Sequence, residues 1–260
     1  MMATAEATTT PIEQLRHANN EDQSSGRKNS RRCSFVITGF GPFAGVPCNP
    51  TSKLISCLQD NKAQLLEDDG VHIRETHILD TSADAAKREI QGIYSRLCND
   101  NLDNEYSTKD DVIVMLHLGV NYRGKKMQLE QCAYNEATFR VPDNNGYQPQ
   151  QKCILGNSST FGQCLRTTLD LHEICSELQL QGESSCCVSQ DPGRFVCNYT
   201  YCLSLDQCRL AKNESANVGC HSLFLHVPSF DVIAEDDQLK FIICLSKTVE
   251  RYVFRSQNMQ

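Results

Sequence analysis

The chain has 260 residues, of which 40% are hydrophobic and none is tryptophan, and its formal net charge at pH 7 is −7. This composition suits a globular protein of one large or two small domains, and the negative charge argues against nucleic-acid binding as the main activity. No apolar run approaches the roughly 20 residues that a membrane-spanning helix needs. The first ten residues lack the basic start and apolar core of a secretory signal, so we expect a cytoplasmic protein.

The fifteen cysteines do not indicate a disulfide-rich secreted domain. The chain is long for such a domain, the count is odd and no signal peptide is evident. Most of the cysteines lie in apolar segments, where a free thiol behaves as a small hydrophobic side chain. Neither a C-x-x-C pair nor a cysteine–histidine cluster at zinc-ligand spacing is present. We therefore expect reduced, mostly inert thiols and no metal.

Residues 1–31 are polar and of mixed charge, and we expect them to form a disordered leader ahead of a single α/β domain over residues 32–260. The domain begins with an apolar strand, Cys33–Gly39, which leads into a loop rich in glycine and proline over residues 40–49. Asn49-Pro50 then opens a helix that we expect to reach about Leu66.

The rest of the chain alternates between strand-like and helix-like segments. The patterns predict a strand at Val71–Leu79, a helix at Ser82–Leu97, a central strand at Asp111–Leu118, a loop at 119–127, an extended segment at Gln128–Asn135, turns at Ala137–Gly156, a helix at Gly162–Leu180, a strand at Cys186–Ser189, a helix at Arg194–Leu210, a strand at Ser222–Pro228 and a last helix from about Asp236 to Phe254. This alternation predicts a three-layer α/β/α sandwich with a mixed, mostly parallel central sheet flanked by helices.

A cysteine and a histidine follow or end two of these strands, where sites form in α/β sheets. Cys197 comes after the turn Asp191-Pro192-Gly193 and begins a predicted helix, whose dipole and unpaired N–H groups would stabilise a thiolate. His226 ends an apolar strand, and such a pair is typical of a cysteine hydrolase. Taken alone, Cys197 is more often a buried structural thiol. His117, near the end of the central strand, is an equal alternative to His226.

Three charged residues each allow two interpretations, and for Glu130 and Arg140 taken alone the second is favoured. Glu130 could orient a histidine or be a solvated edge residue. Arg140 could hold an oxyanion or be a surface cation. Arg194 could stabilise a nearby thiolate or simply pair with Asp191. The Gly39–Gly45 loop does not suit a dinucleotide, because Pro42 removes a backbone donor and no lysine follows, but its two phenylalanines suit a small flat ligand or a core turn.

Taken together, these segments resemble the pyroglutamyl peptidase I family of cysteine peptidases, also called pyrrolidone-carboxylate peptidases. The resemblance runs from about Phe35 to the last helix. It is carried, in the family's order and at about its spacing, by Thr38–Gly45 with Asn49-Pro50, Leu129–Asn135, Arg140–Asn144 with Gly146–Pro149, Ser189–Tyr201, and His226–Pro228.

The resemblance implies a triad in which Cys197 is the nucleophile, His226 the general base and acid, and Glu130 the acidic member that orients the histidine. It implies that Arg140 assists at the oxyanion. It also implies a substrate pocket built by five further residues: Phe40, Phe43, Asn49, Phe195 and Val196. Val120 stands where some bacterial members carry a glutamine that contacts the substrate ring, so ring recognition would rest more on Asn49 and backbone groups.

The activity that the resemblance implies is hydrolysis of the N-terminal pyroglutamyl residue from small peptides, through a thioester acyl-enzyme and without a metal or organic cofactor. No nucleic-acid or membrane partner is expected, and the family includes monomers and homo-oligomers. The alternative is a catalytically inactive homologue that binds pyroglutamyl peptides. Hydrolysis of a pyroglutamyl amide would distinguish the active peptidase from the inactive homologue.

Overall fold

The computed structural model describes residues 32–103, 111–156, 159–213 and 219–258. Residues 1–31, where a leader is predicted, lie outside the described residues. A six-stranded sheet forms the centre, with strand order β2-β1-β3-β8-β4-β7. The strands are β1 (Cys33–Phe40), β2 (His72–Leu79), β3 (Val112–Val120), β4 (Met127–Glu130), β7 (Cys186–Ser189) and β8 (Gly219–Val227). Among these strands only the β4–β8 pair is antiparallel, so the sheet is mixed and mostly parallel.

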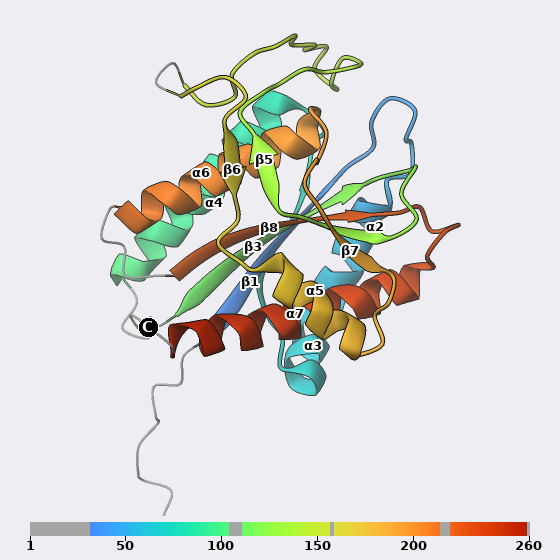
Figure 1. Ribbon diagram of the computed structural model, residues 1–260, viewed down its shortest axis with the longest axis vertical. Helices are drawn as coiled ribbons and strands as arrows, with labels where there is room; N and C mark the ends of the chain where they lie inside the picture. The colour runs from blue at the N-terminus through green and yellow to red at the C-terminus, as the bar shows by residue number, and fades with distance from the viewer. Residues whose placement is uncertain (1–31, 104–110, 157–158, 214–218, 259–260) are drawn as a thin grey trace, which may run out of the picture. The chain divides into compact units, whose positions relative to one another are not determined.

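Helices cover both faces of this sheet (Figure 1). On one face lie α4 (Ala83–Asp103) and α6 (Val196–Asn213); on the other lie α2 (Pro50–Asp60), α3 (Lys62–Asp69), α5 (Leu171–Leu180) and α7 (Glu235–Gln257). Successive side chains of a strand point to opposite faces, so the strands contribute side chains to two separate apolar cores, one on each face of the sheet. Val114 packs into the core under α7, whereas Met115 packs under α4 and α6. The predicted three-layer α/β/α sandwich is confirmed.

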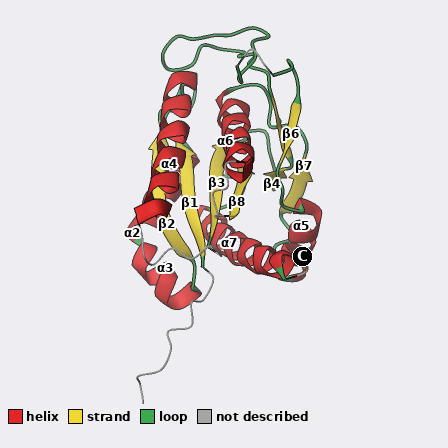
Figure 2. Ribbon diagram, turned by 90° about the vertical axis from the view of Figure 1, so that its left-hand side faces the viewer, coloured by secondary structure: helices red, strands yellow, loops and turns green. Residues whose placement is uncertain are grey.

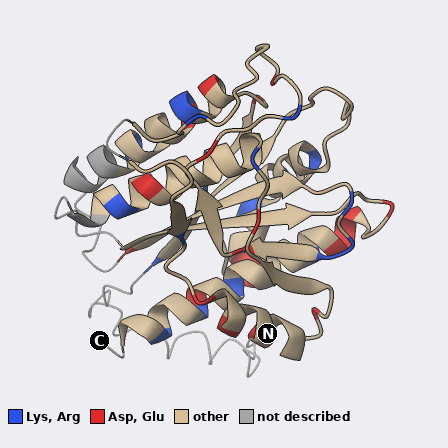
Figure 3. Cartoon of the chain, turned by 45° about the horizontal axis from the view of Figure 1, so that its top comes forward, with Lys and Arg blue, Asp and Glu red and all other residues tan. Residues whose placement is uncertain are grey.

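The most apolar predicted strand is central, as expected. β3 lies between β1 and β8, and all of its residues except Val120 are buried. Strands buried on both faces carry continuous rather than alternating apolar residues. Charged side chains lie mainly on the helices and loops around these strands (Figure 3). None of the helices among the described residues is long and apolar enough to cross a membrane.

Two predicted helices differ from the structure. The helix expected from Asn49 to Leu66 is broken at Asn61, where the side-chain amide and the backbone N–H both donate to the Cys57 carbonyl oxygen and end α2. The helix expected from Gly162 is wrong over its first part. Gly162 has a φ of +71°, outside the helical region, and α5 starts only after Asp170, whose carboxylate accepts the N–H groups of His172 and Glu173.

The misassigned segment contributes instead to a small second sheet. Strand β6 (Cys164–Arg166) pairs in antiparallel fashion with β5 (Cys132–Tyr134), which continues the predicted extended segment beyond β4. The connection between them is the long loop at the top of Figures 1 and 2. The side chain of Asn135 ties this loop down: its oxygen accepts the N–H groups of Ile154 and Leu155, each at 2.8 Å, and its amide donates to the Thr160 carbonyl oxygen.

Candidate active site

Cys197 is the second residue of α6, at the carboxyl-terminal side of the sheet. The turn that leads into the helix requires Gly193, whose φ is +78°. Asp191 closes this turn by accepting the Gly193 N–H at 3.1 Å. Because the first N–H groups of a helix have no intrahelical acceptor, those around Cys197 are available to an anion. The sequence prediction of a thiol at a helix N-terminus is therefore confirmed.

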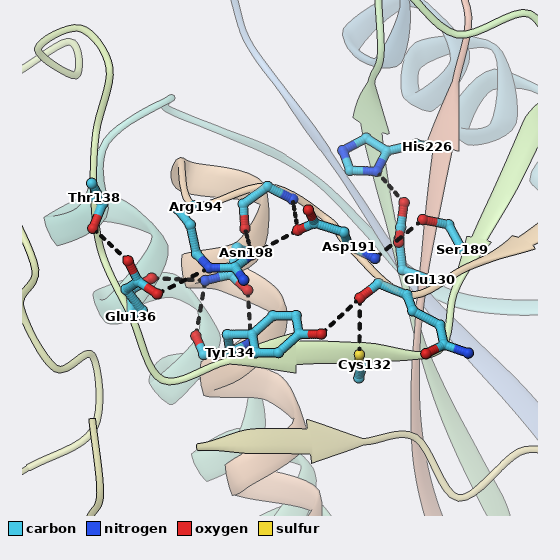
Figure 4. Close-up of polar contacts among 12 residues, drawn as sticks. Glu130, Cys132, Tyr134, Glu136, Thr138, Ser189, Asp191, Arg194, Asn198 and His226 are labelled. Carbon is cyan, nitrogen blue, oxygen red and sulfur yellow. Dashed lines mark hydrogen bonds and ion pairs between the residues drawn. The ribbon is translucent and has the colours of Figure 1, made fainter. Parts of the chain in front are cut away.

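Arg194 fixes the loop in front of Cys197. Its guanidinium lies 2.7 Å from Asp191 and 3.2 Å from Glu136, and it packs 3.9 Å from the ring centre of Tyr134 (Figure 4). Asn198, on α6, accepts the N–H of Tyr134 and so holds the end of β5 against the helix. Arg194 thus pairs with two carboxylates, one of which is Asp191, the partner that the second sequence alternative predicts.

His226 and Glu130 meet across the antiparallel pair of β8 and β4. Nδ1 of His226 lies 2.8 Å from Oε1 of Glu130 (Figure 4). Because the carboxylate can only accept, Nδ1 carries the proton of this bond. Cys197 is also close enough to this imidazole to affect its pKa, and both side chains line the same cavity. The structure therefore brings together all three members of the triad implied by the resemblance.

The electrostatics of His226 follow from these two partners. Burial by itself would lower the pKa of the imidazole, but the neighbouring Cys197 and the hydrogen-bonded, negatively charged Glu130 raise that pKa to about 9. Glu130 is only 1% exposed, and its Oε2 has no hydrogen-bond partner among the described residues. An imidazolium is the charge that compensates such a buried carboxylate. The arrangement favours a charged histidine at neutral pH.

His117, the alternative histidine, has a different environment. Its ring is fully buried between Thr38 Oγ1 and Ser204 Oγ, each at 2.8 Å. No carboxylate among the described residues pairs with this ring, and burial lowers the pKa of His117 to about 3. The ring is neutral and is not among the side chains that line the site. The structure thus separates the two histidines that spacing left equivalent.

Cys197, His226 and Glu130 line one cavity of about 730 Å³. The same cavity is lined by every other residue predicted for the site: Phe40, Phe43, Asn49, Arg140, Phe195 and Val196. Val120 is also at its wall. The aromatic wall is continuous, since the ring centre of Phe195 lies 6.1 Å from that of Phe43 and 4.8 Å from that of Phe139. The cavity therefore has an aromatic, apolar wall that suits a small neutral ring, while polar and charged side chains line the rest of it.

Asn49 is mainly a structural residue of this wall. It is buried and caps α2: its oxygen accepts the Thr51 N–H at 3.1 Å, and its amide donates to the Gly41 carbonyl oxygen at 3.0 Å. Thr51, which the sequence analysis missed, reaches back to the Phe40 N–H. Two polar side chains therefore hold the loop that carries Phe40 and Phe43, and Asn49 keeps one amide hydrogen for a ligand.

The remaining predicted residues differ in exposure. Val196 is fully buried, so it packs into the core beneath the first turn of α6 while contributing to the cavity wall. Phe195 is half-buried. Arg140 is exposed at the cavity and forms no ion pair among the described residues. No group of three or more histidine, cysteine or acidic side chains in the described part of the chain could hold a metal ion.

Gly119 is the main site residue that the sequence analysis missed. It is the last but one residue of β3 and lies directly opposite His226 in the register of β3 and β8. A Cβ built on Gly119 would lie 3.0 Å from Cys197 Sγ and 2.7 Å from the ring of Phe224. Only glycine leaves room for the thiol at this position. The available signal was a glycine closing a buried strand, as Gly39 closes β1, where a Cβ would meet Ile55 at 2.7 Å.

Comparisons with known proteins agree with this geometry. The family model for pyroglutamyl peptidase matches residues 33–253. Pyroglutamyl-peptidase 1 of Mus musculus is 25% identical over 209 residues, which cover 80% of this chain and 85% of that protein. The pyrrolidone-carboxylate peptidase of Pyrococcus furiosus is 24% identical over 195 residues, which cover 74% of this chain and 79% of that protein.

Solved structures show the same fold. The pyrrolidone carboxyl peptidase of Fervidobacterium islandicum superposes with a TM-score of 0.67 at 20% identity and covers 85% of this chain and 100% of its own. The enzyme of Thermococcus litoralis gives 0.65 at 21% identity, covering 86% of this chain and 96% of its own. Since the family model spans every residue of the cavity, from Phe40 to His226, and most of the chain, this protein belongs to the pyroglutamyl peptidase family.

Proposed function

We propose that this protein is a cysteine peptidase that removes the N-terminal pyroglutamyl residue from small peptides. The observation that carries the proposal is the single cavity that joins Cys197, His226 and Glu130 to a wall of phenylalanines. The relatives in its family are named for pyroglutamyl peptidase activity. The cavity supplies the chemistry that such an activity needs.

The pyroglutamyl residue is a neutral lactam without a free amino group. A site for it has no need of the carboxylate that binds a charged N-terminus, and the carboxylates of this cavity are already occupied by His226 and Arg194. Phe40, Phe43 and Phe195 would cover the faces of the ring, and the remaining amide hydrogen of Asn49 would meet its carbonyl oxygen. Val120 offers only an apolar contact.

Cys197 and His226 would carry out the bond cleavage in two steps. The Cys197 thiolate attacks the acyl carbonyl of the pyroglutamyl residue, and the His226 imidazolium gives its proton to the leaving amine, which departs as the shortened peptide. A thioester on Cys197 remains. The now neutral His226 takes a proton from water, the resulting hydroxide cleaves the thioester, and pyroglutamate leaves. Glu130 holds Nδ1 and so presents the other ring nitrogen in one tautomer throughout.

The negative oxygen formed in each step needs donors that are already in place. The free N–H groups at the start of α6, next to Cys197, are fixed by the Asp191–Gly193 turn and by Arg194. The exposed guanidinium of Arg140 would add a positive charge at the same cavity. Removal of one donor of this kind typically slows a reaction about 10²–10³-fold.

We further propose that the protein acts in the cytoplasm on peptides alone, with neither nucleic acid nor membrane as a partner. The described cysteines are free thiols, as a reducing compartment would keep them. The chemistry itself requires a reduced Cys197. This location is tested by fractionation of cells that express the tagged full-length chain.

The direct test compares two cysteine variants on a fluorogenic pyroglutamyl amide. Cys197→Ala should abolish turnover, whereas Cys244→Ala, on α7 and outside the cavity, should keep wild-type kcat/KM. Full activity of Cys197→Ala would refute the assignment. If the wild type binds a pyroglutamate analogue tightly but hydrolyses no pyroglutamyl amide, the inactive-homologue alternative is correct instead.

A further inference from the structure

Two arginines at the cavity have no ionic partner in the described part of the chain. Arg123 and Arg140 both line it, both are exposed, and neither forms an ion pair among the described residues. Most other described arginines do pair, as Arg96 does with Glu75 and Arg251 with Glu177. The two unpaired guanidinium groups therefore face the substrate cavity and solvent.

The acidic side chains of the cavity do not neutralise these two charges. Glu130 is buried and bonded to His226, and Asp191 is bonded to Arg194 at 2.7 Å. Glu130 and Asp191 are the only acidic residues among the described residues that line the cavity. The uncompensated charge of the site is consequently positive, although the chain as a whole carries −7.

The backbone of Arg123 is held in a fixed turn close to the nucleophile. Asn121 accepts the Arg123 N–H with its side-chain oxygen at 3.2 Å and the Gly124 N–H with its carbonyl oxygen at 2.9 Å. The turn follows the end of β3, two residues after Gly119, which lies beside Cys197. The neighbouring Tyr122 donates its hydroxyl to the Cys48 carbonyl oxygen, which ties this loop to the phenylalanine loop. Arg123 is therefore a built part of the cavity rim.

The pyroglutamyl ring does not need these cations. The ring is neutral and small, whereas the cavity measures about 730 Å³ and also has room for the residue after the scissile bond. We propose that Arg123, together with Arg140, makes the site select pyroglutamyl peptides with a carboxylate directly after the pyroglutamyl residue. The carboxylate is either an acidic side chain or the C-terminus of a dipeptide. This inference rests on the proposed function.

The test measures kcat/KM on a set of matched short substrates. These are pyroglutamyl-glutamate amide, pyroglutamyl-alanine with a free C-terminus, pyroglutamyl-alanine amide and pyroglutamyl-lysine amide. Exposed ion pairs are worth about two- to fivefold each, so the wild type should prefer the two carboxylate substrates over alanine amide by about that factor, with lysine amide last. The preference should shrink in about 1 M salt, where charges are screened within about 3 Å. The first two substrates distinguish a side-chain from a C-terminal carboxylate.

Arg123→Gln should reduce the ratio of carboxylate to neutral substrate, and Arg123→Glu should reverse it. Lys125→Gln is the control, because Lys125 is exposed on the same loop but does not line the cavity; its ratios should equal those of the wild type. Equal kcat/KM on all four substrates, or a preference that survives Arg123→Glu, would overturn the inference and leave the peptidase assignment intact. If the wild type cleaves none of the four substrates, the proposed function itself is refuted.

Discussion

His117 and His226 lie on adjacent parallel strands, β3 and β8, and both rings are buried in the same sheet. His117 sits among hydroxyl groups, and its pKa is lowered to about 3; His226 sits between a carboxylate and a thiol, and its pKa is raised to about 9. Burial is common to both, so the charged partners decide the protonation state. The comparison shows how one sheet holds one histidine neutral for structure and another charged for chemistry.

The largest effect should separate the two histidines directly. His226→Gln should lower kcat/KM on a pyroglutamyl amide by about 10²–10⁴-fold, the usual contribution of a general acid–base. His117→Gln should instead reduce the free energy of unfolding by about 2 kcal/mol, through loss of the hydrogen bonds to the buried Thr38 and Ser204 hydroxyls, of which only Ser204 keeps other partners among the described residues, with a much smaller change in kcat/KM. Kinetics and urea unfolding of both purified variants make the comparison. If His117→Gln were inactive but fully stable, the catalytic histidine would be His117 and not His226.

A smaller effect is expected from Glu130→Gln. A hydrogen bond between charged groups is worth about 1.5–3 kcal/mol, so kcat/KM should fall about 10- to 10²-fold. Loss of the carboxylate also removes a cause of the raised pKa of His226. The imidazolium is present below a pH of about 9 and is lost as pH rises through that value, so the alkaline limb of kcat/KM should move to lower pH in the variant. An unshifted limb would show that Glu130 does not set the charge of His226.

The smallest effect concerns the point where β3 meets the site. Gly119→Ala should destabilise the fold by about 1–3 kcal/mol through overpacking against Phe224, and kcat/KM should fall because Cys197 Sγ is displaced. Gly92→Ala on α4 is the matched control, since its added Cβ meets only Arg96 Nη1, at 3.6 Å. That change should be neutral or stabilising. Equal thermal stability and activity of the two variants would mean that the thiol has room to move.

Sequence patterns predicted the regular parts of the fold well. The apolar run of β3 located the centre of the sheet, because a strand buried on both faces leaves a continuous apolar signature. Local patterns failed where the contacts of one polar side chain decide where a helix begins or ends. Asn61 ends α2, and Asp170 caps the start of α5 well after the predicted position. These side chains act by hydrogen bonds to the backbone, which the spacing of hydrophobic residues does not reveal.

The candidate site was predicted in composition but not in detail. The resemblance brought Glu130 into the triad, although the residue alone read as a solvated edge glutamate. Its burial beside His226 depends on the antiparallel pairing of β4 with β8, which no local pattern reveals. The clamp on Arg194 joins Glu136 and Asp191, residues far apart in the chain. Gly119 likewise matters only because α6 brings Cys197 beside it.

The charge on His226 is the central claim of this account, and side-chain NMR of the histidine rings tests it most directly. His226→Gln and His117→Gln spectra assign the two rings in the ligand-free protein. The account predicts that His226 is doubly protonated at neutral pH and titrates near pH 9, while His117 stays neutral in mildly acidic solution. A His226 ring that is neutral at pH 7 and titrates at the ordinary value of about 6.5 would contradict it.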